Sequence, residues 1–165
     1  MLSGVMLAEI IDRILAVVDG EVITLSDVSS ALRFGFVQPP AGVDPIRFAL
    51  DRLIERQLML REVERYGPAE PSPAAIDQAV EEVRERFGGA SRLAAALKQS
   101  GMAEDLLRRR IRDDLRIRAY LDQRFAAVTP SSDDDRRRNA IADWIAGLRR
   151  RAEVTILYES IPSAA

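Results

Sequence analysis

The chain contains no cysteine and no histidine. Disulfide bonds and metal sites built on thiolate or imidazole ligands are therefore excluded. The same two absences exclude every nucleophilic or acid–base mechanism that depends on a cysteine or histidine side chain. The lack of cysteine does not distinguish an oxidising compartment from a reducing one, because proteins of both kinds can lack it.

Sequence motifs for nucleotide binding and hydrolysis are missing as well. The chain has no Gly-x-Ser-x-Gly, no phosphate-binding loop and no Gly-x-Gly-x-x-Gly. The acidic run Asp133–Asp135 lacks the spacing and the internal glycine of a calcium-binding loop, and it suits the positive end of a following helix. We expect no catalytic residue, no metal and no cofactor, so an enzyme is the weaker hypothesis.

Long apolar runs are also absent, and no stretch is long enough to span a bilayer, so we expect no stable membrane insertion. The segment Met1–Ala8 is short, apolar and uncharged, and it lacks the basic start of a signal peptide. It does resemble the last part of an apolar signal region that ends in a small residue. Two interpretations stay open: the remnant of a truncated or mis-started signal peptide, or an N-terminal tail.

Charge of either sign is not in excess. The 24 basic and 26 acidic residues give a net charge of −2, which argues against a general binder of polyanions. Asp113 and Asp114 lie within a cluster of arginines, and Glu104 and Asp105 come one turn before it. Such mixing of opposite charges is typical of a solvated helix face. We therefore expect no nucleic-acid partner. The clustered residues are Arg108, Arg109, Arg110, Arg112, Arg116 and Arg118.

The two ends of the chain carry the β-strand signals. Asp19-Gly20 lies between two β-branched runs, which predicts a hairpin over residues 13–24 with a type I′ turn. Residues 153–158 read as one more strand. An isolated hairpin is marginal in water, so we expect Val154–Tyr158 to dock beside Ile14–Val18 or Val22–Thr24.

Everything between the strands has helical patterning, and prolines and glycines mark the boundaries. Thr24 or Ser26 is expected to cap a helix that starts near Asp27, and Ser91 to cap a short helix that ends at Gly101. The other predicted helices run from Asp44-Pro45 to Tyr66, from Ser72-Pro73 to Gly88-Gly89, from Ala103 to Phe125, and through Ile141, Trp144, Ile145 and Leu148.

These elements predict a mainly α fold, a helical bundle-like body with a small antiparallel sheet formed by the N-terminal β-hairpin and the C-terminal strand. At 165 residues, 47% of them hydrophobic, the chain is long enough for one domain with a core. The expected organisation is a tail or signal-peptide remnant over 1–8, a single domain over 9–158 with helices over 26–151, and a flexible tail over 159–165.

Apolar residues outside the regular helical stripes are candidates for contacts with a peptide. Phenylalanine and methionine on an adaptable surface suit the binding of varied apolar segments. The alternative is that each of these side chains completes the core. Phe34, Phe36 and Val37 flank a proline-rich loop. Phe48 and Met59 lie off the main apolar stripe of the helix that begins at Pro45, and Met102 follows Gly101.

Several segments, taken in order, resemble the SurA-type periplasmic chaperones. The segment DRILAVVDGEVITLSDV (Asp12–Val28) resembles the opening of that family, and LIERQLMLREVERYG (Leu53–Gly67) resembles the helix that follows. The closing helix and strand of the family resemble ADWIAGLRRRAEVTILY (Ala142–Tyr158). The intervening segments 71–88 and 106–125 fit the next helices of its chaperone region.

Members of the family usually carry prolyl isomerase domains of the parvulin type between the long helix and the closing helix. In this chain only residues 126–132 lie between those two helices. The resemblance implies a chaperone module without the isomerase. It would be an ATP-independent, periplasmic holdase for unfolded outer-membrane or secreted proteins, with aromatic-rich polypeptides as partners; a cytoplasmic location is the alternative. Two other functions stay open: a residual peptidyl-prolyl cis-trans isomerase, and a structural module that forms a homodimer by exchanging its terminal strands.

Overall fold

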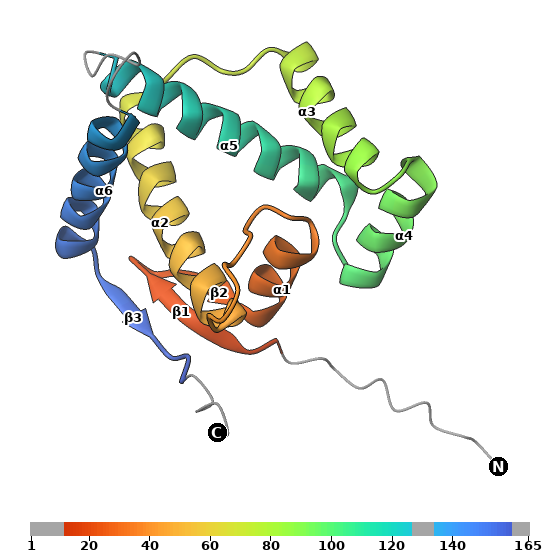
Figure 1. Ribbon diagram of the computed structural model, residues 1–165, viewed down its shortest axis with the longest axis horizontal. Helices are drawn as coiled ribbons and strands as arrows, with labels where there is room; N and C mark the ends of the chain where they lie inside the picture. Colours follow the sequence, from red (N-terminus) through yellow and green to blue (C-terminus); the bar gives the residue numbers. More distant parts are fainter. Residues whose placement is uncertain (1–11, 127–133, 160–165) are drawn as a thin grey trace.

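The computed structural model describes residues 12–126 and 134–159. Over these residues a helical body rests on a small sheet, and the ends of the chain meet in that sheet (Figure 1). The mainly α fold with a small antiparallel sheet is therefore confirmed. The strands are β1 (Ile14–Val18), β2 (Glu21–Thr24) and β3 (Val154–Ile156), and the helices are α1 (Leu25–Arg33), α2 (Pro45–Tyr66), α3 (Pro73–Arg86), α4 (Ala90–Ser100), α5 (Glu104–Arg124) and α6 (Asp134–Arg151).

The sheet has the order β2-β1-β3, and both pairings are antiparallel. Val17 in the central strand lies opposite Val22 on one side and Thr155 on the other. The predicted return of the C-terminal strand is confirmed, and its partner is β1. The turn between β1 and β2 has φ of 48° at Asp19 and 90° at Gly20, the two positive values that a type I′ turn requires.

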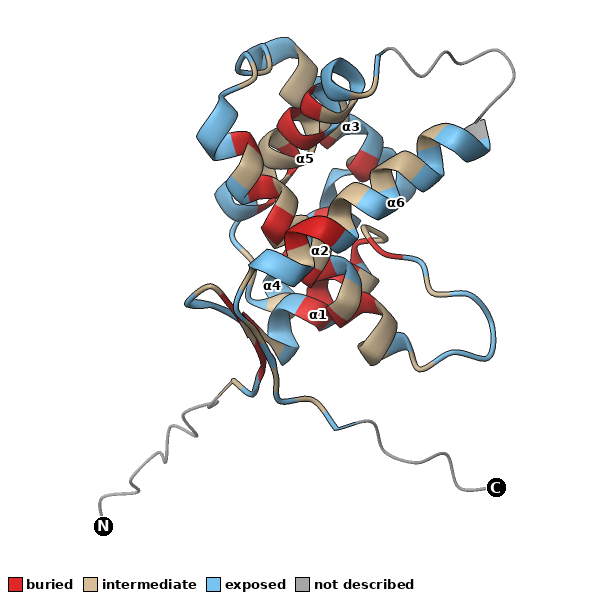
Figure 2. Ribbon diagram, turned by 90° about the vertical axis from the view of Figure 1, so that its left-hand side faces the viewer, coloured by how far each residue is buried: buried red, intermediate tan, exposed pale blue. Residues whose placement is uncertain are grey.

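Helix α2 is the centre of the body. Asp44 caps it, Pro45 occupies its first turn, and Gly67 ends it in the left-handed conformation, as the sequence predicts. The helix packs against α1, α5, α6 and β1. Figure 2 shows buried residues along α1, α2 and α5. The apolar residues of α2 spread over more than one stripe because the helix is covered on several sides.

Thr24 caps α1, which confirms one of the two predicted caps, but the start of α1 and the cap of α4 differ from the prediction. Helix α1 begins at Leu25 rather than near Asp27, because Thr24 and Asp27 form a capping box. The Asp27 N–H donates to the Thr24 hydroxyl oxygen, and the Thr24 N–H donates to the Asp27 carboxylate. Helix α4 begins at Ala90 with Gly89 as its cap, so the prediction of Ser91 as the cap is wrong. Gly89 has φ of 114°, a conformation open to glycine, and it leaves Ser91 inside the first turn.

The core has three clusters of buried residues. The first lies between the sheet, α1, α2 and Leu148 of α6. The second joins α3, α4 and the first half of α5 to Phe34, which follows α1. The third joins the ends of α2 and α5, and Trp144 of α6 packs against it. In Figure 1, α3 and α4 lie at the opposite side of the molecule from α6, so Phe34 and α5 connect the two sides.

Some expectations concern residues that the structure does not describe. The segment 1–8, Asp133 and residues 160–165 of the predicted tail lie outside the described residues. Among the helices of residues 12–126 and 134–159, none is both long enough and apolar enough to cross a membrane.

Candidate binding groove

A hollow of about 570 Å³ lies between α2, α5 and the loop that joins α1 to α2. We call it the α2–α5 groove. It brings together Phe36, Val37, Phe48 and Met59, four of the six residues predicted to contact a peptide. Its remaining lining residues are Gln38, Arg52, Leu53, Arg56, Arg110, Asp114, Ile117, Arg118 and Leu121.

The floor of the groove is apolar. Leu53 and Ile117 belong to buried clusters of the core, while Phe36, Phe48 and Met59 are only partly buried and pack against those clusters. The floor residues are thus supported from below and retain an open side. This arrangement suits a weak apolar contact, because Met59 can adapt its unbranched side chain to different partners.

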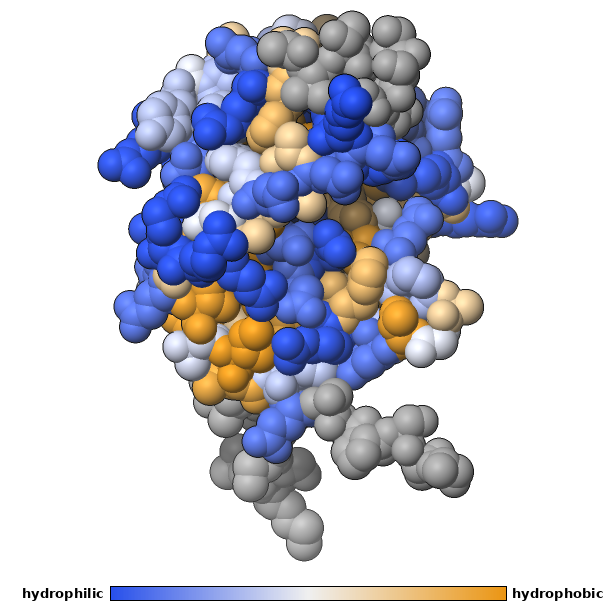
Figure 3. All heavy atoms as spheres, turned by 60° about the vertical axis from the view of Figure 1, so that its left-hand side comes forward, coloured by the Kyte–Doolittle hydropathy of each residue, from blue (hydrophilic) through white to orange (hydrophobic). Residues whose placement is uncertain are grey.

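Arginines border the floor and cover its aromatic rings. The guanidinium carbon of Arg110 lies 4.5 Å from the centre of the Phe36 ring, and that of Arg52 lies 5.1 Å from the centre of the Phe48 ring. Both distances are within the range of cation–π attraction. The two rings are therefore partly shielded from water by charged groups. On the face of the molecule shown in Figure 3, hydrophobic patches likewise lie between hydrophilic side chains.

Arg56 joins the two walls of the groove. Its Nε donates to Asp114 Oδ1 at 2.6 Å, and its Nη2 donates to the carbonyl oxygen of Arg110 at 3.3 Å. Asp113 Oδ2 lies 3.8 Å from the same Nη2. Only 17% of the Arg56 side chain is exposed, so these interactions are protected from solvent. They fix the separation of α2 and α5 and hence the width of the groove.

The Arg110 guanidinium lies in an unusual environment. Burial lowers its pKa to about 10, and the nearby positive charge of Arg56 adds to the effect. Its Nε is buried and has no hydrogen-bond partner within residues 12–126 and 134–159. Arg110 remains charged at neutral pH, because a pKa of about 10 is far above 7. A largely desolvated positive charge therefore borders the groove.

A second hollow, of about 550 Å³, adjoins the groove between α3 and α5. The two share Phe36, Asp114 and Arg118 among their lining residues. The second hollow is more polar along α3, where Glu82, Glu85 and Arg86 border it. A chain segment longer than a single side chain could therefore extend from the α2–α5 groove toward α3.

Phe34 and Met102 do not line the groove. Phe34 is 2% exposed and lies 5.4 Å from Phe87, ring centre to ring centre, in the second core cluster. Met102 packs against the same cluster beside α3, α4 and α5. The positions of both side chains are explained by packing, which is the alternative that the sequence left open.

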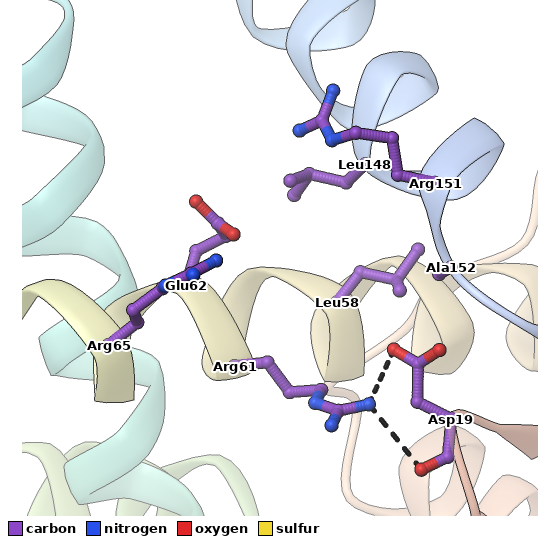
Figure 4. Close-up of a pocket in the computed structure, with 8 residues that line it drawn as sticks. All are labelled: Asp19, Leu58, Arg61, Glu62, Arg65, Leu148, Arg151 and Ala152. Carbon is purple, nitrogen blue, oxygen red and sulfur yellow. Dashed lines mark hydrogen bonds and ion pairs between the residues drawn. The ribbon is translucent and has the colours of Figure 1, made fainter.

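Another hollow, of about 490 Å³, lies where α2, α6 and the hairpin turn meet (Figure 4). Arg61 points across it to Asp19 and contacts both the carboxylate and the backbone carbonyl oxygen of that residue. Leu58 and Leu148 form an apolar wall, and the remaining lining is mostly charged. The Arg61–Asp19 ion pair fastens the hairpin to α2, so we assign this hollow a structural role.

Metal-binding chemistry has no support among the described residues. Over residues 12–126 and 134–159, no group of three or more aspartate or glutamate side chains is placed to hold a metal ion.

No model of a known protein family matches the chain, and neither does any curated protein.

Proposed function

We propose that this protein is an ATP-independent chaperone module that binds unfolded polypeptide segments in the α2–α5 groove. The observation that carries the proposal is the convergence of Phe36, Phe48 and Met59, which are only partly buried, on one apolar floor beside the buried Val37. The resemblance to the SurA-type chaperones supports the proposal and suggests aromatic-rich outer-membrane proteins as clients. It also suggests the periplasm as the compartment.

The proposed mechanism is passive. An apolar segment that enters the groove loses contact with water at a gain of about 25 cal/mol for each square ångström buried. A groove of about 570 Å³ holds one or two large side chains, so each contact is weak and reversible. Such contacts keep a client from aggregating while leaving it free to fold. The mechanism requires no bond chemistry, and hence no catalytic residue.

An aggregation assay tests the proposal. An outer-membrane β-barrel unfolded in urea is diluted into buffer, and light scattering is followed with and without a several-fold excess of this protein. We expect the protein to suppress scattering, and Phe48→Ser to weaken suppression because it removes an aromatic ring from the floor. Leu106→Ser is the matched control, since Leu106 is exposed on α5 and does not line the groove.

The outcome distinguishes function from folding. Circular dichroism and the fluorescence of Trp144, the single tryptophan, establish that each variant is folded. Absence of suppression by the folded wild-type protein would contradict the proposal. Equal suppression by Phe48→Ser and Leu106→Ser would remove the groove as its site. A protease-coupled isomerisation assay on the same samples tests for the residual isomerase activity that the resemblance leaves open.

A further inference from the structure

The α2–α5 groove carries more positive than negative charge. Four arginines and one aspartate line it, although the whole chain has a net charge of −2. Arg52 has its own carboxylate, since its Nη1 lies 2.6 Å from Glu55 Oε2. Arg56 likewise has Asp114, at 2.6 Å. The charges of these two arginines are therefore balanced within the protein.

The other two arginines of the groove are not balanced in this way. The Nε of Arg110 is 3.8 Å from Asp114 Oδ2, a carboxylate that already accepts a hydrogen bond from Arg56. Arg118 is exposed and has no ion pair within the described part of the chain. Both arginines line the groove, so two guanidinium groups face any occupant without a carboxylate of their own.

The geometry of a guanidinium lets it serve two partners at once. Its flat face stacks on an aromatic ring, while its N–H groups point outward in the plane of the group. Arg110 already stacks on Phe36, its Nε is buried beside Asp114, and 19% of its side chain is still exposed. A carboxylate could approach the edge of Arg110 without displacing it from the ring. Such charge-assisted hydrogen bonds are stronger than those between neutral groups.

We propose that the groove prefers extended peptide segments in which aromatic residues stand next to aspartate or glutamate. This inference rests on the proposed function and specifies the class of client segment. The aromatic side chain of the client packs on the floor formed by Phe48 and Met59, and its acidic neighbours pair with Arg110 and Arg118. The groove thus selects among aromatic segments by charge.

Binding of three synthetic peptides tests the preference. The peptides are acetylated and amidated, share the same two phenylalanines and two tyrosines, and carry aspartate, asparagine or lysine beside them. Fluorescence anisotropy should give a dissociation constant roughly tenfold lower for the aspartate peptide than for the lysine peptide, as two partly exposed ion pairs allow. The difference should shrink when salt rises from about 0.05 M to about 0.5 M, because salt screens exposed charges.

Two arginine variants locate the effect. Arg118→Gln should reduce the preference for aspartate by about threefold, the loss of one exposed ion pair. Arg109→Gln is the matched control, because Arg109 is an exposed residue of α5 that does not line the groove, and it should leave the preference unchanged. Equal effects of the two substitutions would overturn the assignment to Arg118.

The result separates this inference from the function on which it rests. If the three peptides bind with equal affinity, or the lysine peptide binds most tightly, the charge preference is wrong and peptide binding stands. If none of the peptides binds, the proposed function and the charge preference both fail.

Discussion

Asp19 and Glu153 form a reciprocal pair of hydrogen bonds that joins the two ends of the chain. The Asp19 N–H donates to the carbonyl oxygen of Glu153 at 2.7 Å, and the Glu153 N–H donates to Asp19 Oδ1, also at 2.7 Å. The same carboxylate forms the ion pair with Arg61 of α2. One residue in the hairpin turn therefore holds the C-terminal strand and the central helix together.

Substitution of Asp19 should expose this role. Asp19→Ala removes the carboxylate, and alanine does not favour the backbone φ of 48° that position 19 adopts. We therefore expect the free energy of unfolding to fall by about 2–3 kcal/mol. Asp19→Asn tolerates positive φ and keeps an oxygen for the Glu153 N–H, and should cost about 1 kcal/mol. Urea unfolding followed by Trp144 fluorescence measures both. Equal stability of the two variants would contradict the argument.

Arg56 is the next test of how the molecule is held together. Arg56→Ala leaves Asp114 without its main partner and separates α2 from α5, so we expect a loss of about 1–3 kcal/mol in the free energy of unfolding. Arg52→Ala is the matched control. Its side chain is 52% exposed, its ion pair with Glu55 lies within one helix, and its loss should cost less than about 1 kcal/mol.

The same two variants report on the groove. A binding assay with an aromatic peptide should show a larger loss of affinity for Arg56→Ala than for Arg52→Ala, since only the former alters the distance between the walls. If the two substitutions cost the same stability, the bridge between α2 and α5 is not what fixes the groove.

Local signals made most of the fold predictable. The Asp44-Pro45 and Ser72-Pro73 pairs mark the starts of α2 and α3 because each combines a capping side chain with a residue preset for the first turn. The start of α4 was not predictable in the same way. Ser91 is a better capping residue than Gly89 by its side chain, and only the backbone conformation at Gly89 decides between them.

The site was predictable in part. Phe36, Val37, Phe48 and Met59 stand out because they interrupt regular patterning, and the structure brings them together. The place of Arg110 and Arg118 at the groove was not predictable, because the mixed charges around them are typical of a solvated helix face, and no sequence pattern singles out Arg56. Their position over the apolar floor depends on how α2 packs against α5, which no local pattern encodes.

Phe34 and Phe36 test the boundary between core and groove, since the two residues look alike in the sequence. Phe34→Ala should lower the free energy of unfolding by about 3–5 kcal/mol, because it empties a site between Phe36 and Phe87 that is 2% exposed. Phe36→Ala should cost less than half as much and should weaken peptide binding more. Unfolding and peptide titration on the same samples separate the two effects. Weaker binding in folded Phe34→Ala than in Phe36→Ala would contradict the division.

Asp44 gives the protein an acid-sensitive contact between α2 and the C-terminal segment. The N–H groups of Arg47 and Ile46 donate to its Oδ1, and the Tyr158 O–H donates to its Oδ2 at 2.8 Å. The hydrogen bond from Arg47, with smaller contributions from Tyr158 and Ile46, lowers the pKa of the Asp44 carboxyl below its usual 3.8. The ionised form is therefore favoured by folding.

The sign of the pH dependence follows from that shift. A carboxyl with a lowered pKa in the folded state stabilises the protein fully above its unfolded pKa, and the stabilisation disappears as pH falls through the folded pKa. Asp44→Asn should therefore be less stable than wild type at neutral pH, and the difference in urea midpoint should shrink below pH 3.8. Tyr158→Phe removes one of the three hydrogen bonds and should give a smaller effect of the same sign. A midpoint difference that stays constant from neutral to acid pH would show that the charge of Asp44 does not contribute.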